Sequence, residues 1–284
     1  MSYEKISGFS DEIDSNIDVQ FDVLCKLGIK YFEPRGINGK NISLLDDGEV
    51  AELKAKMDAC GIKASSIGSP IGKVKVSDSF EEHFATFERV VRTARMLGAK
   101  YIRMFSFYPD DSGVWHEGDR EEIIRRLKIM IDYARNQGVV LLHENEKDIF
   151  GDSVERCLDL MSTLGCESFR AVFDPANFVQ CGVDTVKAFD LLYPYVEYIH
   201  IKDAKAGDGT VVPAGLGDGN FKYILTKLFE NGYKGFLSLE PRLGSFEGLA
   251  DLELDDKMLD LPKSGEGTFT LAYNSLCDIL KEII

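Results

Sequence analysis

Apolar and polar positions along the chain follow a repeated unit: an amphipathic stretch, a glycine-containing turn, and a short run of β-branched and aromatic residues. Glycine is favoured just after a helix because it has no Cβ to hinder a left-handed backbone. The apolar runs are too short for helices and nearly continuous, as in strands that are buried on both faces. The turns of this kind contain Gly28, Gly61, Gly98, Gly138, Gly165 and Gly232.

This pattern predicts eight strands, each followed by a helix. The strands begin near residues 5, 29, 62, 100, 139, 169, 196 and 235, and residues 271–284 form the last helix. Parallel strands require such crossovers, and a unit of about 35 residues is usual in a closed barrel. An open doubly wound sheet is the alternative, but no glycine-rich dinucleotide fingerprint follows the first strand. We therefore predict an α/β protein with one domain, a (β/α)8 TIM barrel over residues 1–284.

The connection between the eighth strand and the final helix, residues 241–267, interrupts this regularity. A connection longer than about 15 residues in a compact domain usually forms a lid or a binding loop. We therefore expect this segment to lie over a ligand site.

The chain of 284 residues is acidic, with 33 Lys and Arg against 48 Asp and Glu and a formal charge of −15. Such a field repels nucleic acid, and no cluster of basic residues offers a local exception. The N-terminus lacks the pattern of an export signal, and no apolar run reaches the roughly 20 residues of a membrane helix. We expect a cytoplasmic protein with neither a nucleic-acid nor a membrane partner.

Candidate chemistry lies at the ends of the last four predicted strands, which run into Glu144, Asp174, His200 and Glu240. In a barrel the functional side chains gather at the carboxyl ends of the strands. Converging carboxylates repel one another, and a divalent cation is the usual means of holding them together. Three carboxylates and one imidazole suit Mn²⁺ first, with Co²⁺, Mg²⁺ or Zn²⁺ as alternatives. A structural zinc would prefer Cys and His ligands.

Each of these four residues also has a structural alternative. Glu144 and Glu240 could form ion pairs, Asp174 could cap the next helix, and His200 could be a satisfied core histidine. Their occurrence at successive strand ends favours binding of one metal ion.

Other polar residues at the strand ends are candidates for contacts with a substrate. His143 alternates away from Glu144, so we expect it to face the helices. Asp11 and Glu12 could cap the helix that begins near Asn16. The candidates for contacts with substrate hydroxyl or phosphate groups are Lys202, Arg103, Ser106, Glu33 and Arg35.

The sequence around these residues resembles the sugar phosphate isomerase/epimerase family, the xylose isomerase-like TIM barrels. This family includes D-tagatose 3-epimerase-like enzymes, hydroxypyruvate isomerase and inosose dehydratase, and the resemblance covers essentially the whole chain. Four motifs carry it in order: LLHENE with Glu144, VFDPANF with Asp174, YIHIKD with His200 and LSLEPRL with Glu240. The segment VVPAGLGDG, residues 211–219, is similar to the family's loop after strand seven.

The resemblance implies that the four residues bind one divalent metal and that Glu144 and Glu240 act as an acid/base pair. A metal on the carbonyl and hydroxyl oxygens of a sugar would stabilise the enediolate formed by proton removal. Return of the proton gives an epimer or an isomer, and loss of a β-hydroxyl gives a dehydrated product. We therefore expect a metal-dependent isomerase or epimerase of a small sugar or sugar derivative. An inosose-type dehydratase and a non-catalytic sugar-binding barrel remain alternatives.

The sequence departs from the ketose epimerases of this family at three places. Asn177 stands where several of them have histidine, Arg242 replaces the histidine of an EPH motif, and Lys202 and Lys205 replace an arginine. Asn177 and Arg242 are therefore further candidates for substrate contacts.

Endonuclease IV-like enzymes share this fold, but they hold three zinc ions with many histidines and have a basic DNA groove. Four histidines and a charge of −15 argue against that class. Related barrels often form dimers or tetramers, so we expect a homo-oligomer whose ligand is a small carbohydrate.

Overall fold

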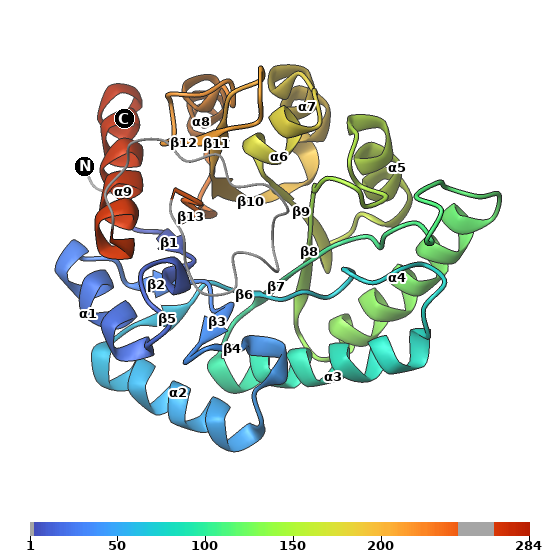
Figure 1. Cartoon of the computed structure of the whole chain (residues 1–284), viewed down its shortest axis with the longest axis horizontal. Helices are drawn as coiled ribbons and strands as arrows, with labels where there is room; N and C mark the ends of the chain where they lie inside the picture. The colour runs from blue at the N-terminus through green and yellow to red at the C-terminus, as the bar shows by residue number, and fades with distance from the viewer. Residues whose placement is uncertain (1–2, 244–263) are drawn as a thin grey trace.

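The strands form a ring around one axis, and the helices form a second ring outside it (Figure 1). The computed structural model describes residues 3–243 and 264–284. Seven parallel strands make one curved sheet in the order β1-β13-β10-β9-β8-β7-β6. These strands are β1 (Ile6–Gly8), β6 (Ser66–Gly68), β7 (Tyr101–Met104), β8 (Val140–Glu144), β9 (Phe169–Phe173), β10 (Val196–Ile201) and β13 (Phe236–Leu239).

Two very short strands, β2 (Tyr31–Phe32) and β5 (Lys63–Ala64), pair with each other and complete the ring between β1 and β6. The amide of Glu33 donates to the carbonyl of Gly8 at 2.8 Å, which joins this pair to β1. The next residue is Pro34, which has no amide hydrogen, so β2 cannot continue as a regular ladder. Two small hairpins lie outside the ring and are formed by β3 (Gly36–Ile37) with β4 (Lys40–Asn41) and by β11 (Asp203–Ala204) with β12 (Val211–Val212).

Helices connect successive barrel strands as predicted. The α-helices of the described chain are α1 (Ile17–Leu27), α2 (Asp47–Cys60), α3 (Phe80–Leu97), α4 (Asp119–Asn136), α5 (Val154–Leu164), α6 (Pro175–Gln180), α7 (Thr185–Leu192), α8 (Phe221–Glu230) and α9 (Gly265–Ile283). The predicted strand starts agree with the observed ones to within two residues, the largest difference being 29 against 31. The prediction of a (β/α)8 TIM barrel is therefore confirmed.

The long connection predicted at 241–267 is mostly outside the described residues, because residues 244–263 are not among them. Its C-terminal boundary was wrong by a few residues, since helix α9 begins at Gly265 with Ser264 as its N-cap. The role of this segment as a lid stays a prediction.

The barrel interior is apolar at its N-terminal end and polar at its C-terminal end. One cluster of buried side chains fills the lower interior: Tyr101, Val140, Leu142, Val172, Tyr198 and Phe236. Because side chains alternate along a strand, Leu142 and Glu144 of β8 point to the same side, as do Tyr198 and His200 of β10. The apolar layer therefore forms the floor on which the charged residues rest.

The predicted left-handed glycines occur after most helices, but Gly165 differs. Gly28, Gly61 and Gly98 have φ angles of 73°, 69° and 73°. Gly165 has φ −56°, so the prediction of a left-handed conformation there was wrong. A Cβ at this position would lie 2.3 Å from the carbonyl oxygen of Met161, which explains why the turn needs glycine.

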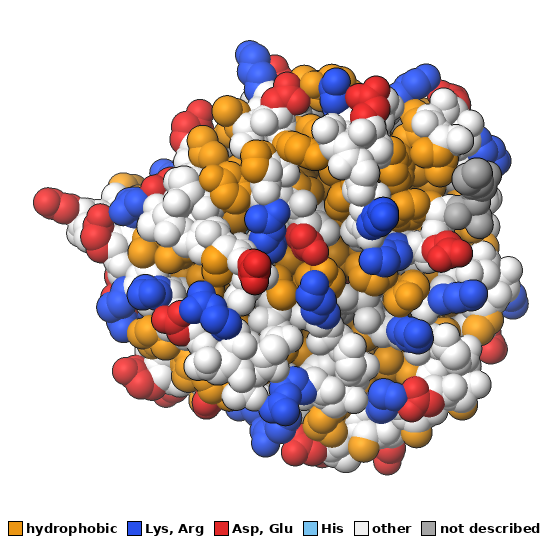
Figure 2. Space-filling view, turned by 180° about the vertical axis from the view of Figure 1, so that it is seen from behind, with side chains coloured by type: hydrophobic (Ala, Val, Ile, Leu, Met, Phe, Trp, Pro, Cys, Tyr) orange, Lys and Arg blue, Asp and Glu red, His pale blue; other side chains and the backbone are white. Residues whose placement is uncertain are grey.

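The face opposite the carboxyl strand ends shows many Lys and Arg side chains around its centre (Figure 2). Four exposed lysines follow a helix-terminal glycine by two residues, namely Lys30, Lys63, Lys100 and Lys234. None of these four forms an ion pair with another described residue. They lie close to helix C-termini, whose partial negative charge favours cations. The helix C-termini at this face thus explain why basic side chains gather there, although the chain as a whole is acidic.

Within the described chain, no helix combines the length and the hydropathy needed to cross a bilayer.

The buried histidine of α3, His83, gives a testable prediction about stability. Its Nε2 accepts the amide hydrogen of Gly72 at 3.1 Å. Burial, helped by the charge of Arg126, lowers the pKa of His83 to about 4. The unfolded chain binds this proton near pH 6.5, so stability should fall between about pH 6.5 and pH 4, by up to roughly 3 kcal/mol from this residue.

Urea unfolding of the His83→Gln variant between pH 7 and pH 4 should therefore show a shallower loss of stability than the wild type. His116 is exposed and serves as the control, because His116→Gln should keep the wild-type slope. The prediction fails if both variants follow the wild-type curve.

Candidate metal centre

Strand register places the four predicted ligands at one level of the barrel. Phe173 of β9 pairs with Ile199 of β10, so the residues that follow them, Asp174 and His200, also lie side by side. Ile201 pairs with Leu239, and the amide of Glu240 donates to the carbonyl of Ile201 at 3.2 Å. Adjacent parallel strands that end together bring their last side chains to the same rim.

The four side chains converge inside the barrel. Their candidate ligand atoms lie within 4.8 Å of one another, and all four residues are buried. His200 Nδ1 is 2.8 Å from Glu144 Oε1, 3.3 Å from Glu240 Oε2 and 3.8 Å from Asp174 Oδ2. The structure therefore brings together the whole set that the sequence proposed.

The donor set fits a divalent cation. Asp174 Oδ2 and Glu240 Oε2 are buried without a hydrogen bond, and both face the imidazole of His200. Buried carboxylate oxygens are costly when they are left without partners. Three carboxylates and a nitrogen donor are ligands that Mn²⁺, Mg²⁺ or Zn²⁺ accept.

The charges in this cluster shift one another's pKa values. Burial raises the pKa of Asp174 to about 7, although the charge of Lys202 opposes the shift. Burial also disfavours the ionised form of Glu144. The charges of His200 and Arg103 together have a larger effect and lower the pKa of Glu144 to about 2. Burial lowers the pKa of His200, yet the carboxylates of Glu144 and Glu33 raise it well above its usual value.

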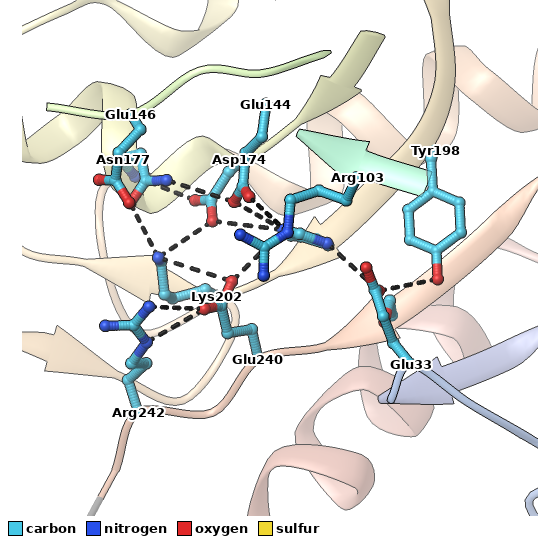
Figure 3. A network of polar contacts seen from close by, with 12 residues as sticks. Glu33, Arg103, Glu144, Glu146, Asp174, Asn177, Tyr198, Lys202, Glu240 and Arg242 are labelled. Carbon is cyan, nitrogen blue, oxygen red and sulfur yellow. Dashed lines mark hydrogen bonds and ion pairs between the residues drawn. The ribbon is translucent and has the colours of Figure 1, made fainter. Parts of the chain in front are cut away.

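Lys202 reaches the centre from the end of β10 and is buried. Its Nζ donates to Asn177 Oδ1 at 2.8 Å and lies 3.1 Å from Asp174 Oδ2 and 3.7 Å from Glu240 Oε2 (Figure 3). Burial disfavours the ammonium, but Asp174 and Glu240 raise the pKa of Lys202. Lys202 is thus a fixed positive charge beside the carboxylates.

Three arginines hold the two glutamates. Arg103 Nε lies 3.3 Å from Glu144 Oε2, and Arg242 donates through Nε and Nη2 to Glu240 Oε1 at 3.0 and 2.8 Å (Figure 3). Arg35 Nη1 donates to the same Glu240 oxygen at 3.3 Å. Oε1 of Glu240 is therefore occupied by guanidinium groups, while its Oε2 faces the centre.

Several other predicted residues make contacts that differ from the expected ones. Asp11 and Glu12 do not cap the first helix, whose N-cap is Asn16; they form ion pairs with Arg35 at 2.8 and 3.1 Å. Arg35 is thus a buried link between loops, with 4% of its surface exposed, instead of a free substrate contact.

Ser106 and Glu33 are also engaged in buried contacts within the protein. Ser106 Oγ lies 2.9 Å from His143 Nε2 and accepts the amide hydrogen of Gly151 at 2.9 Å, so it joins His143 in holding a loop. Glu33 is fully buried on the other side of His200, where it accepts a hydrogen bond from Tyr198. Both side chains thus have hydrogen-bond partners within the protein, and their contact with a substrate stays a prediction.

The sequence reasoning missed three contributors. Asn145 forms two hydrogen bonds of 2.9 Å with the backbone of Asp174 and so fixes this residue. Lys73 Nζ lies 3.1 Å from Glu146 Oε2, and burial lowers the pKa of this lysine. Asn145 and Glu146 stand in the LLHENE motif beside Glu144, which could have indicated them; Lys73 lies in a distant loop with no such signal.

The loop at residues 211–219 is folded around Asp203. The carboxylate of Asp203 accepts amide hydrogens from Gly215, Gly217 and Gly219 at 2.8, 3.0 and 2.8 Å. A Cβ on Gly217 would lie 2.4 Å from Asp203 Oδ1. Gly217, and Gly219 with a distance of 2.6 Å to the same atom, are therefore required by the close approach of backbone to carboxylate.

Comparison with known proteins agrees with this architecture. The family model described as xylose isomerase-like TIM barrel matches residues 21–256. The chain belongs to this family. Members of the xylose isomerase-like TIM barrels include isomerases and epimerases of small carbohydrates as well as dehydratases.

Individual relatives are distant. A 3-dehydroshikimate dehydratase from Bacillus anthracis is 20% identical over 135 residues, which is 48% of this chain and 48% of that protein. The crystal structure of the IOLI protein, which holds a zinc atom, has 17% identity and a TM-score of 0.78 and covers 99% of both chains. A D-tagatose 3-epimerase-like protein has 15% identity and a TM-score of 0.74 over 98% of both chains. At these identities the two structures support the fold alone.

Replacement of Asp174 by Asn tests the cluster as a cation site. Asp174 Oδ1 caps α6 by accepting the amide hydrogen of Asn177, and asparagine can do the same. Asp174→Asn should therefore stay folded but lose the rise in Tm that Mn²⁺ gives the wild type, measured by differential scanning fluorimetry.

Asp184→Asn is the matched control, because Asp184 caps α7 in the same way outside the site. This variant should respond to Mn²⁺ as the wild type does. An equal Mn²⁺ response in Asp174→Asn would contradict the assignment.

Proposed function

We propose that this protein is a divalent-metal-dependent isomerase or epimerase of a small sugar or sugar derivative. The observation that carries the proposal is the buried cluster of Glu144, Asp174, His200 and Glu240, with two carboxylate oxygens that lack hydrogen bonds. Buried carboxylate oxygens that lack hydrogen bonds, with the fixed cation Lys202 beside them, fit chemistry in which negative charge develops on substrate oxygens.

The four residues would hold one ion, for which Mn²⁺ is our first choice. When bound, such an ion supplies the positive charge that makes a proton next to a carbonyl acidic and stabilises the resulting enediolate. The ammonium of Lys202 lies within 3.7 Å of Asp174 and Glu240 and would donate a hydrogen bond to a substrate oxygen at the same place.

Glu144 and Glu240 are our candidates for moving the proton. They reach the centre from β8 and from the end of β13, and both lie within 3.3 Å of His200 Nδ1. Approach from different strands allows one carboxylate to remove a proton and the other to return it. Arg103 and the pair of Arg35 and Arg242 would hold these carboxylates in place.

Dehydration is a second candidate, because the relative matched over 135 residues is a 3-dehydroshikimate dehydratase. Loss of a β-hydroxyl requires a proton donor near the leaving oxygen. Lys202 is buried at the centre, where Asp174 and Glu240 favour its ammonium form, so it is our candidate for this proton donor.

Solvent exchange separates these reactions. Ketoses, aldoses, hydroxypyruvate, inososes and 3-dehydroshikimate would be incubated in D₂O with the Mn²⁺-loaded protein and followed by NMR. Deuterium incorporation without loss of water supports an isomerase or epimerase, and a dehydrated product supports the second candidate. Absence of both with every compound would contradict the proposal and favour a binding function.

Glu240→Gln should lower the rate of deuterium exchange by about 10²–10⁴-fold, because the variant can neither accept nor return the proton. Glu230→Gln, at the exposed end of α8, is the control and should exchange at the wild-type rate. Undiminished exchange in Glu240→Gln would remove this residue from the mechanism.

A further inference from the structure

A buried carboxylate, Glu33, lies behind His200 in a position that the proposed chemistry does not use. Glu33 directly follows β2, and its amide is fixed by the hydrogen bond to Gly8. Its side chain is fully buried, and its carboxylate lies beside the hydroxyl of Tyr198 (Figure 3). No Lys or Arg among the described residues forms an ion pair with it.

One oxygen of this carboxylate is held in a fixed position. Glu33 Oε2 accepts hydrogen bonds from Tyr198 Oη at 2.9 Å and from Ser238 Oγ at 2.7 Å. The hydroxyl of Tyr198 is in turn 2.8 Å from Ser65 Oγ, which donates to the carbonyl of Phe32 at 3.0 Å. Residues of β2, β10 and β13, together with Ser65 between β5 and β6, thus position Glu33, although a buried carboxylate is expensive unless it serves a partner.

The partner that remains is His200. Its Nε2 lies 3.4 Å from Glu33 Oε2. Both Nε2 and Glu33 Oε1 are buried and without a hydrogen bond in the described structure, so a small rotation of the carboxylate would satisfy both atoms. The ring of His200 cannot turn away, because Phe9 and Tyr198 pack against it edge to face at 5.2 and 5.8 Å.

The two nitrogens of His200 therefore have different surroundings. Nδ1 faces the carboxylates of the centre, and Nε2 faces Glu33. An imidazole that binds a cation through Nδ1 must carry its hydrogen on Nε2, and an acceptor at Nε2 fixes this tautomer and increases the basicity of Nδ1.

We propose that Glu33 is a positioning residue that accepts the Nε2 hydrogen of His200 and thereby sets the affinity of the centre for a divalent cation. This inference rests on the proposed metal site. It assigns Glu33, with Tyr198 and Ser238 as its supports, a role through His200 instead of a contact with the substrate.

Isothermal titration with Mn²⁺ tests the inference without any substrate. Glu33→Gln should bind Mn²⁺ 10–100-fold more weakly than the wild type, because the neutral amide oxygen is a weaker acceptor for the Nε2 hydrogen than the carboxylate. With Co²⁺ in place of Mn²⁺, the variant should also show a changed visible absorption spectrum, since a weaker acceptor at Nε2 makes Nδ1 a weaker donor to the metal. A loss of packing alone would not alter this spectrum.

Glu197→Gln is the matched control, because Glu197 also accepts a hydrogen bond from a tyrosine, Tyr101 at 2.6 Å, but lies outside the centre. It should keep the wild-type affinity and spectrum. If Glu33→Gln does not fold, Ser238→Ala removes one donor from the same oxygen and should weaken Mn²⁺ binding several-fold.

Wild-type Mn²⁺ affinity in a folded Glu33→Gln or Ser238→Ala variant would overturn this inference and leave the proposed function intact. Failure of the wild type itself to bind Mn²⁺, Co²⁺, Mg²⁺ or Zn²⁺ would overturn the proposed function and the inference with it.

Discussion

Three carboxylates and an imidazole gathered within 4.8 Å of one another, away from water, are the constraint around which this barrel is organised. Like charges at such distances repel strongly in a medium of low polarity. Cations offset this repulsion at each carboxylate: Arg103 at Glu144, Lys202 at Asp174, and the guanidinium groups of Arg35 and Arg242 at Glu240. The guanidinium groups bind Oε1 of Glu240 and Oε2 of Glu144, whereas Lys202 lies beside Asp174 Oδ2 and Glu240 Oε2, the oxygens that face His200.

The barrel holds these charged side chains rigidly in place. Apolar side chains fill the interior below the charged level, and hydroxyl groups of Tyr198 and Ser238 form the transition between the two. The outer helices end at the opposite face, where lysines compensate their dipoles. The buried charged residues therefore lie at the carboxyl ends of the strands, whereas the opposite end of the barrel contributes to stability. Barrels of this kind generally show this division.

Three of the positions at which the chain departs from ketose epimerases, Asn177, Lys202 and Arg242, lie at the centre, whereas Lys205 is exposed. Asn177 accepts a hydrogen bond of 2.8 Å from Lys202, and Arg242 binds Glu240. Changes at these positions therefore affect the same edge of the centre. Because one fold hosts many reactions, this edge is where the choice of substrate should be sought.

The sequence by itself determined the eight strands, the helices between them and the four converging residues, because each depends on local periodicity and on which residue ends a strand. It could also have indicated Tyr198, which lies two residues before His200 and so shares its face. Only the tertiary structure showed that Arg35 ties Asp11 and Glu12 to Glu240, that Ser106 belongs to a loop contact, and that Glu33 lies behind His200. These partners are up to 205 residues apart along the chain, and closure of the barrel, which no local pattern encodes, decides which charges meet.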